Sequence, residues 1–316
     1  MKFQTGIGLE ACKHFYNRGA KLIMTGRSKQ RLEAARDEIV KNATEKHGNP
    51  TILITDFADL DQLKSAATQF LEWNIHIDIL LNNAGIMAVP KKQSTPQGLE
   101  LQIGTNHFGP WLFTELIRSR VKTGGRIVIT ASNYSDAGTA KTSTGRVLAD
   151  ICFDDINFES REYEAYTAYA QSKLANVLHA MELAKRCEDR NISVVSLHPG
   201  FVATNLLNHN FPALVPKWIV NMFLMYKLGQ IDIWTGVQTT LHCCLNDDVR
   251  HHTGEFYAQR NSPNGSKTKF QIFYKRGFSA ADRNIFSICS RKFDIHRNSS
   301  WSSYRKCFGL RFRVFS

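Results

Sequence analysis

The chain has 316 residues, enough for one large α/β domain or two smaller ones, and its 43% hydrophobic and 22% charged residues are ordinary for a protein that buries a core. Its seven cysteines show no C-x-x-C spacing, which argues against a disulfide framework and a zinc site and indicates reduced thiols. The formal net charge is +12, and residues 260–316 carry most of it with 13 Lys/Arg against 2 Asp/Glu.

Apolar runs alternate with amphipathic stretches along most of the chain. The expected strands are Lys21–Thr25, Thr51–Thr55, Ile77–Leu81, Arg126–Thr130 and Ile192–Leu197. The expected helices are Gln30–Ala43 with Ser28 as its cap, a stretch from Asp59 or Asp61 to Trp73, Gly98–Val121, and Tyr166–Arg186. Strands that are apolar throughout and alternate with helices predict an α/β, doubly wound parallel sheet of the Rossmann type.

Two later segments fit this alternation less well. Residues 212–228 contain the run Trp218–Tyr226, which is too short to span a bilayer. We interpret it as a core helix or a lid over a substrate pocket, with a helix that dips into a membrane surface as the alternative. After Tyr257 the periodicity is lost, so we expect one domain at residues 1–258 and a basic, irregular extension at residues 259–316.

Location and partners follow from the same features. The sequence shows no secretory signal and no transmembrane anchor, which predicts a cytoplasmic protein. Peripheral contact with intracellular membranes through residues 212–228 or the basic tail is an open alternative, as is a tail that is only solvated. The tail carries no nucleic-acid-binding motif, so nucleic acid is not an expected partner.

A glycine-rich turn stands near the start of the chain. In Gly6-Ile7-Gly8 the absence of side chains on the glycines lets backbone N–H groups at a helix N-terminus approach a pyrophosphate. Arg27 follows the next strand, at the position where an acid would bind the ribose of NAD and an arginine the 2′-phosphate of NADP. Asp56, after the second strand, can contact the adenine side. These residues indicate NADP(H), although Arg27 and Asp56 are also common types beside turns.

A candidate acid/base pair lies on the expected helix at 166–186. Tyr169 and Lys173 are four residues apart, hence on one helix face, and a neighbouring ammonium is expected to lower the pKa of the phenol. Ser132 ends a strand where its hydroxyl can bind a carbonyl oxygen. Asn106 stands inside a helical pattern that mildly disfavours it, which hints at a hydrogen-bonding role. No metal site is expected.

Together these motifs resemble the short-chain dehydrogenase/reductase family, and most closely its members similar to retinol dehydrogenases and to the WW-domain oxidoreductase. The resemblance covers roughly residues 5–258. It rests on Gly6-Ile-Gly8, Asn82-Asn-Ala-Gly85, Asn106 in Thr-Asn-His-Phe-Gly, Ser132, Asp155-Ile-Asn-Phe158, the run Ala168–Val177 around Tyr169, and His198-Pro-Gly200.

The resemblance implies roles for these residues. Tyr169 would exchange a proton with the substrate oxygen, Lys173 would lower its pKa and hold the nicotinamide ribose, and Ser132 would orient the substrate. Asn106 would support a water relay. The remaining cofactor residues implied are Asn83, Ala84 and Gly85 in the groove, with Pro199, Gly200 and Thr204 beside the nicotinamide. The reaction would be hydride transfer between NADP(H) and an apolar alcohol or carbonyl compound, such as a retinoid, steroid or lipid aldehyde, in a homodimer.

The sequence departs from the family at both ends. Met1 and Lys2 stand where the family's T-G-x-x-x-G-x-G turn has Thr and its first Gly, so we expect the sheet to lack its first, central strand. The basic tail replaces a closing segment that is usually acidic and helical. Two other functions therefore remain open: a catalytically impaired member that acts as an interaction protein, and a module that binds membrane or nucleic acid through its tail.

Overall fold

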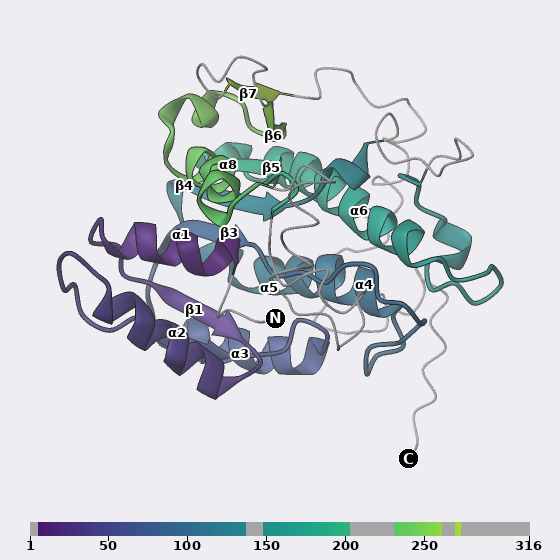
Figure 1. Cartoon of the computed structure of the whole chain (residues 1–316), viewed down its shortest axis with the longest axis horizontal. Coiled ribbons are helices and arrows are strands. Elements are labelled where there is room, and N and C mark those ends of the chain that lie inside the picture. The colour runs from purple at the N-terminus through teal and green to yellow at the C-terminus, as the bar shows by residue number, and fades with distance from the viewer. Residues whose placement is uncertain (1–5, 137–147, 203–230, 261–268, 273–316) are drawn as a thin grey trace.

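The structure, a computed structural model, describes residues 6–136, 148–202, 231–260 and 269–272. Segment 212–228, Thr204 and nearly all of the basic tail lie outside the described residues. Figure 1 shows the described part as alternating helices and strands. The strands are β1 (Ile23–Gly26), β2 (Thr51–Ile54), β3 (Ile77–Asn82), β4 (Val121–Thr130), β5 (Ser193–His198), β6 (Phe256–Arg260) and β7 (Lys269–Ile272).

The helices cover these strands. They are α1 (Ile7–Tyr16), α2 (Lys29–Lys41), α3 (Leu60–Glu72), α4 (Leu101–Ile103), α5 (Gly109–Ile117), α6 (Ala165–Arg186) and α8 (Ile233–Leu245). A π-helical turn, η1 (Gly104–Phe108), joins α4 to α5. Single 3₁₀ turns are η2 (Arg118–Arg120), η3 (Asn133–Ser135), η4 (Phe153–Asp155), η5 (Glu188–Arg190) and η7 (Asp247–His251).

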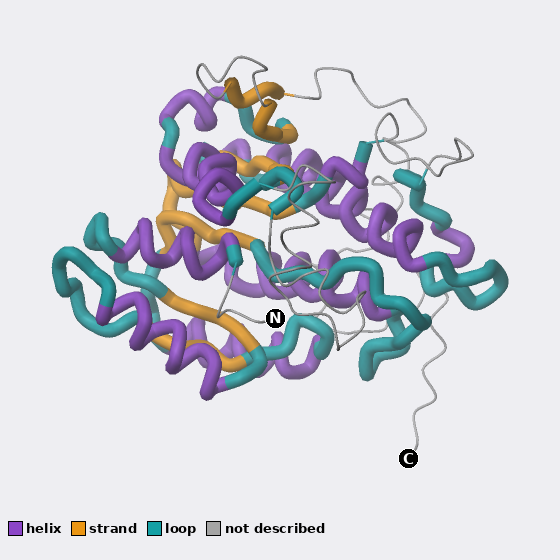
Figure 2. Tube along the Cα trace, viewed as in Figure 1, coloured by secondary structure: helices purple, strands orange, loops and turns teal. Residues whose placement is uncertain are grey.

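The strands form two separate sheets. β1 pairs with β2 in parallel, and β3, β4, β5 and β6 form a second parallel sheet to which β7 adds an antiparallel edge. In the described part of the chain no strand lies between β1 and β3, so the facing edges of the two sheets are not hydrogen-bonded to each other. Figure 2 shows the strands in two groups with a helix between them. In the described residues the sheet thus lacks the central strand, as the sequence analysis expected.

Helix α1 joins the two sheets through side chains alone. On one side, Leu9 of α1 packs in a buried cluster with Met24 of β1. On the other side, Ala11 packs with Val237 of α8, which covers the larger sheet. α1 accordingly lies between the β1–α2 layer and the β3–β5 strands in Figure 1. The smaller sheet is held to the larger one by apolar packing and not by a backbone ladder.

A second apolar cluster joins the sheets on the opposite face. It is built mainly from α3 and α5, and it includes Leu53 of β2. Ile23 of β1 and Leu80 of β3 pack against the same cluster while staying partly exposed. The β3 strand is thus less well covered than β4, whose residues Ile127, Val128 and Ile129 are at most 1% exposed.

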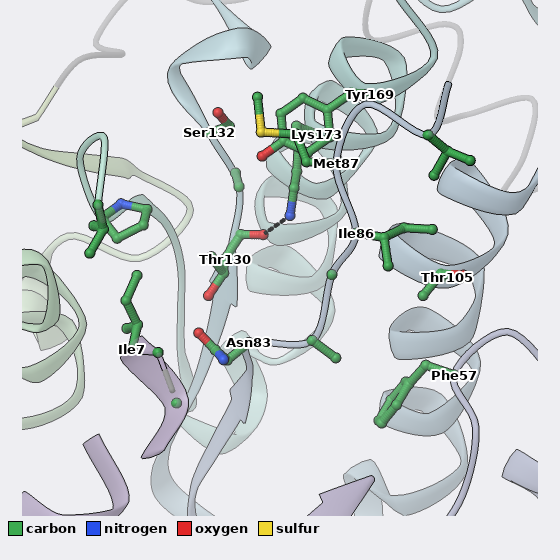
Figure 3. A pocket seen from close by; sticks show the side chains of 18 of the residues that line it. Ile7, Phe57, Asn83, Ile86, Met87, Thr105, Thr130, Ser132, Tyr169 and Lys173 are labelled. Atoms are coloured by element: carbon green, nitrogen blue, oxygen red, sulfur yellow. Dashed lines mark hydrogen bonds between the residues drawn. The ribbon is translucent and has the colours of Figure 1, made fainter. Parts of the chain in front are cut away.

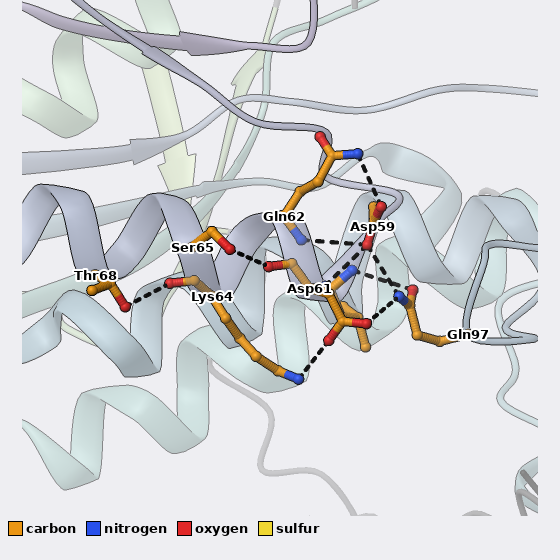
Figure 4. A network of polar contacts seen from close by, with 8 residues as sticks. Asp59, Asp61, Gln62, Lys64, Ser65, Thr68 and Gln97 are labelled. Carbon is orange, nitrogen blue, oxygen red and sulfur yellow. Dashed lines mark hydrogen bonds and ion pairs between the residues drawn. The ribbon is translucent and has the colours of Figure 1, made fainter. Parts of the chain in front are cut away.

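Side-chain caps begin two of the predicted helices as expected. The Ser28 hydroxyl accepts a hydrogen bond from the Arg31 N–H at 3.4 Å and caps α2. Asp59, one of the two predicted alternatives, caps α3 by accepting from the N–H groups of Asp61 and Gln62. The Gln97 amide donates to Asp59 and Asp61, so this cap also anchors the loop before α4 (Figure 4).

Several boundaries differ from the sequence expectation. The helix expected over Gly98–Val121 is broken into α4, η1 and α5 and ends earlier, because Val121 already pairs with β3 as the first residue of β4. The sequence analysis did not predict α8. It also expected an irregular extension from residue 259, whereas β6 continues to Arg260 and β7 pairs with it.

No described helix has the length and hydropathy needed to cross a bilayer. The described residues also contain no group of three or more His, Cys, Asp or Glu side chains placed to hold a metal ion. The described cysteines, among them Cys243 and Cys244, are free thiols.

The split sheet predicts unequal protection of backbone amides. We expect the amides of β1 and β2 to exchange with solvent at least about tenfold faster than those of β4 and β5, because β4 and β5 are hydrogen-bonded on both edges and β1 and β2 on one. Hydrogen–deuterium exchange under native conditions measures this, with β4 as the internal reference. Equal protection of the two sheets would contradict the prediction.

Candidate active site

One cavity of about 670 Å³ lies along the carboxyl ends of β1 to β5. In doubly wound sheets this edge, at the point where the strand order reverses, is where ligands bind. The cavity extends from the N-terminus of α1 to the face of α6 that carries Tyr169 and Lys173. It therefore touches both sheets, with β1 and β2 at one end and β4 and β5 at the other.

Nearly all predicted site residues meet in this cavity. Those that line it are Gly6, Ile7, Gly8, Arg27, Asp56, Asn83, Ala84, Gly85, Ser132, Tyr169, Lys173, Pro199 and Gly200. Asn106 does not line it and lies buried behind the loop that follows β3. Thr204 falls outside the described residues.

The N-terminus of α1 opens into one end of the cavity. Gly6 precedes the helix with φ of +148°, a conformation that favours glycine, and a Cβ atom there would find no atom within 4 Å. Among the residues that the structure describes, no side chain caps the first turn of α1. The free N–H groups and the partial positive charge of a helix N-terminus suit a phosphate.

Arg27 and Asp56 stand side by side at the same end. Arg27 follows β1 and Asp56 follows β2, and their Nη1 and Oδ2 atoms are 3.7 Å apart. Asp56 also accepts a hydrogen bond from the Ala58 N–H at 3.0 Å. The Arg27 side chain is 58% exposed, so its guanidinium can turn toward a bound anion without the cost of desolvation.

At the other end, Tyr169 and Lys173 project from α6 toward the cavity (Figure 3). Both are buried, at 5% and 3% exposed. The Lys173 ammonium donates a hydrogen bond to the Thr130 carbonyl at 3.0 Å, and its Nζ lies 5.7 Å from the centre of the Tyr169 ring. Ser132, at the N-terminus of η3, lies beside Tyr169.

Burial controls the protonation of this pair. Desolvation raises the pKa of Tyr169 to about 12, and the neighbouring Ser132 hydroxyl acts in the opposite direction. Desolvation also lowers the pKa of Lys173 to about 8. The sequence analysis expected the ammonium to lower the pKa of the phenol, but in the structure burial dominates. At neutral pH the phenol is protonated and the amine carries most of its charge.

Asn106 holds the loop that carries the cavity's central wall. Its Oδ1 accepts from the Ile86 N–H at 2.7 Å, and its Nδ2 donates to the Ile86 carbonyl at 2.9 Å and to the Ser172 hydroxyl at 2.9 Å. Gly85 allows this contact, since a Cβ there would stand 3.2 Å from the Asn106 Oδ1 and 3.3 Å from the Lys173 Nζ. The structure thus shows the hydrogen-bonding role that the sequence suggested for Asn106.

The sequence analysis missed three polar groups that face the cavity. Thr55, Thr130 and His198 line it, and their side-chain atoms Oγ1, Oγ1 and Nδ1 are buried without a hydrogen-bond partner. Each is the last residue of a strand or the next one, a position that marks the ligand edge of the sheet. Buried polar atoms without partners are costly in proteins, and a polar ligand would satisfy these.

Apolar and aromatic side chains line the cavity beyond Tyr169. They are Met87, Val89, Pro90, Tyr134 and Phe201. The Tyr134 ring lies edge-on to Tyr169, with 5.7 Å between the ring centres, and stacks on Tyr166. A ligand group beside the Tyr169 hydroxyl would therefore contact mostly carbon.

Comparison with known proteins gives consistent matches. The family model for short chain dehydrogenases matches residues 3–144. A short-chain dehydrogenase of Brassica napus chloroplasts, TIC 32 A, is 33% identical over 268 residues, covering 81% of this chain and 78% of its own. Human retinol dehydrogenase 11 is 33% identical over 258 residues, covering 80% of this chain and 74% of its own.

Solved structures show the same fold. An uncharacterised protein from Mycobacterium paratuberculosis superposes with a TM-score of 0.62 at 26% identity, covering 98% of this chain and 92% of its own. A blue fluorescent protein from a metagenomic library, solved in complex with NADPH, has a TM-score of 0.58 at 22% identity and covers 81% of this chain and 92% of its own.

The contacts of Asn106 predict a measurable loss of stability. Asn106→Ala leaves the partly buried N–H and carbonyl of Ile86 without their Asn106 partners, so we expect the free energy of unfolding to fall by about 2 kcal/mol. Urea unfolding followed by circular dichroism measures this. Asn42→Ala, at an exposed asparagine after α2, is the control and should change stability little. An unchanged midpoint for Asn106→Ala would contradict the structure.

Proposed function

The chain belongs to the short-chain dehydrogenase family, and from this premise we propose that it transfers a hydride between NADP(H) and an apolar alcohol or carbonyl compound. The observation that carries the proposal is a single cavity with an uncapped helix N-terminus at one end and the buried Tyr169–Lys173 pair at the other. A nicotinamide dinucleotide is long enough to need both ends, and each end offers the chemistry that one half of it requires.

The protein's own residues would handle the proton. The cofactor supplies the hydride when bound. Tyr169, protonated at neutral pH because its pKa is raised to about 12, would donate its proton to the substrate oxygen during carbonyl reduction and become a phenolate. In alcohol oxidation the phenolate form of Tyr169 would accept the proton from the substrate hydroxyl. Ser132 beside it would donate a hydrogen bond to the same oxygen. Lys173 would hold the nicotinamide ribose, and its charge would stabilise the phenolate left on Tyr169.

The remaining polar groups would position the cofactor. The first turn of α1, with Gly6, Ile7 and Gly8, would take the pyrophosphate. Backbone and side chains at Asn83, Ala84 and Gly85 would line the groove, and Pro199, Gly200 and Thr204 would flank the nicotinamide. Asn106 would support the proton relay by fixing Ile86 and α6 relative to each other.

Arg27 favours NADP(H) over NAD(H). Its exposed guanidinium follows β1, where a 2′-phosphate would lie, and it can exchange its partner Asp56 for that phosphate. Asp56 would then be left to contact the adenosine. A carboxylate at the position of Arg27 would favour the free ribose hydroxyls of NAD.

The substrate would be apolar. The lining near Tyr169 includes Met87 and Tyr134, and the sequence between Leu206 and Leu228 is rich in aromatic and aliphatic residues. Retinoids, steroids and lipid aldehydes all fit this description. Pairing into a homodimer in the cytoplasm, with peripheral membrane contact through residues 212–228 or the basic tail, completes the proposal.

The split sheet favours a second candidate function. A sheet divided between β1 and β3 places the two ends of the cofactor site on parts that no backbone ladder joins. A chain with this split sheet that does not bind a cofactor would act as an interaction protein.

The proton role of Tyr169 gives the first activity prediction. Tyr169→Phe should lower kcat by about 10³-fold or more, because the proton donor is lost. The dissociation constant of NADPH should stay within about threefold, because the ring and its packing remain. Steady-state reduction of an apolar aldehyde and fluorescence titration of NADPH measure the two. Retained turnover would overturn the role.

The position of Arg27 gives a second prediction, on cofactor binding. Arg27→Asp should weaken NADPH by about 10²-fold and NADH by less than about threefold, since only NADPH loses a charge-assisted hydrogen bond. Isothermal titration calorimetry with both cofactors measures this. Lys29→Asp, an exposed cation in the first turn of α2, is the control. Equal losses for both cofactors would contradict the phosphate role, and no binding of either to the folded wild type would favour the second candidate.

A further inference from the structure

Asn176 is a buried side chain that none of the roles above uses. It lies on α6 three residues after Lys173 and is 3% exposed. Its Nδ2 donates to the Asn106 carbonyl at 3.0 Å and to the Thr130 carbonyl at 3.1 Å. Its Oδ1 lies 3.2 Å from the Nδ1 of His107. One amide thus links α6 to the π-helical turn η1 and to the end of β4.

The chemistry of these partners fixes the orientation of the amide. Backbone carbonyls only accept hydrogen bonds, so the NH₂ group of Asn176 must face Asn106 and Thr130. The oxygen then faces His107, which must carry its proton on Nδ1. Burial lowers the pKa of His107 to about 4, so this ring is neutral and stays in that tautomer at neutral pH.

The Asn106 carbonyl stands where a regular α-helix would offer it no donor. In a regular α-helix it would accept from the N–H four residues later, but that residue is Pro110, which has no N–H. The side chain of Asn176 supplies a donor at this point. It thereby anchors the π-helical turn at the residue whose own side chain holds Ile86 and Ser172.

The Thr130 carbonyl receives two donors. The Lys173 ammonium bonds it at 3.0 Å and the Asn176 amide at 3.1 Å. A carbonyl oxygen has two lone pairs, so both bonds can form together. The other ionisable side chains that the structure describes at this end of the cavity are Tyr169, Tyr134 and His198. Burial raises the pKa of Tyr169 to about 12, raises that of Tyr134 and lowers that of His198 to about 4, so all three are neutral at pH 7.

We propose that Asn176 is a positioning residue for the proposed hydride transfer: by binding the carbonyls of Asn106 and Thr130, it sets where the Lys173 ammonium and the Ile86 loop stand relative to the reacting groups. This inference rests on the proposed function. Without the amide, the Thr130 carbonyl is free to move and water can enter beside Lys173, so the ammonium is both misplaced and better solvated.

The test compares Asn176→Ala with a matched control, Asn157→Ala. Asn157 is also a buried asparagine bonded to backbone, and like Asn176 it does not line the cavity. It accepts from the Glu100 N–H at 2.9 Å, before α4, whereas Asn176 bonds the carbonyl that also binds Lys173. Both variants should lose stability. Only Asn176→Ala should lower kcat, by about tenfold or more, with the dissociation constant of NADPH within about threefold.

A second readout does not depend on turnover. The pKa of Lys173 is followed by NMR of ¹³C-labelled lysine in the wild type and both variants, with Lys173→Arg to identify its resonance. Asn176→Ala should raise this pKa by about half a unit or more, because solvation favours the charged amine, and Asn157→Ala should leave it unchanged. An unchanged pKa and an unchanged kcat in Asn176→Ala would overturn the proposal, as would equal changes in the control.

The two readouts separate the inference from the proposed function. If the wild type shows no turnover but Asn176→Ala shifts the pKa of Lys173, the proposed function fails and the positioning stands. If Asn176→Ala does not fold, Asn176→Ser replaces it, since the hydroxyl keeps one donor. Its pKa shift should have the same sign and be smaller, and no shift would overturn the proposal.

Discussion

The hydrogen bond from the Lys173 ammonium to the Thr130 carbonyl is the contact on which the rest of the site depends. A positive charge that is 3% exposed is costly unless polar groups surround it, and this carbonyl is its described hydrogen-bond partner. The bond fixes α6 to the end of β4, and so sets the distance between the helix that carries Tyr169 and the strand that leads to Ser132. Because Gly85 leaves no side chain in the way, the loop after β3 closes against the same ammonium.

The charged groups at the two ends of the cavity differ in their exposure to solvent. Near α1 the charges are exposed and exchangeable, as the Arg27–Asp56 pair shows, so an anion can bind there with little desolvation. Near α6 the groups are buried, and desolvation raises the pKa of Tyr169 and lowers that of Lys173. On the proposed function, recognition would belong to the first end and proton chemistry to the second. The N-terminus of α1 lies at the first end with Thr55, and Thr130 lies at the second, both hydroxyls having no hydrogen-bond partner among the described residues.

Much of this could be predicted from the sequence because it is local or periodic. The apolar runs located the strands, Ser28 and Asp59 began the helices they were expected to cap, and the four-residue spacing placed Tyr169 and Lys173 on one face. The sequence could not show that burial would outweigh the ammonium in setting the pKa of Tyr169, because burial depends on how loops from distant parts of the chain close over α6. Nor could it pair Asn176 with Asn106, which are 70 residues apart and meet only because η1 packs on α6.

The division of the sheet between β1 and β3 couples folding to binding. The smaller sheet, with α2, is attached to the larger sheet through the side chains of α1 and of the α3–α5 cluster. In the described residues this side-chain packing stands in place of a continuous ladder of backbone hydrogen bonds. A molecule that fills the whole cavity touches the ends of β1 and β2 as well as those of β4 and β5. Such a molecule would connect the two sheets, and part of its binding free energy would go into holding them in place relative to each other. The affinity of this chain for such a ligand and the free energy that holds its two sheets together are therefore thermodynamically linked: a change in one changes the other.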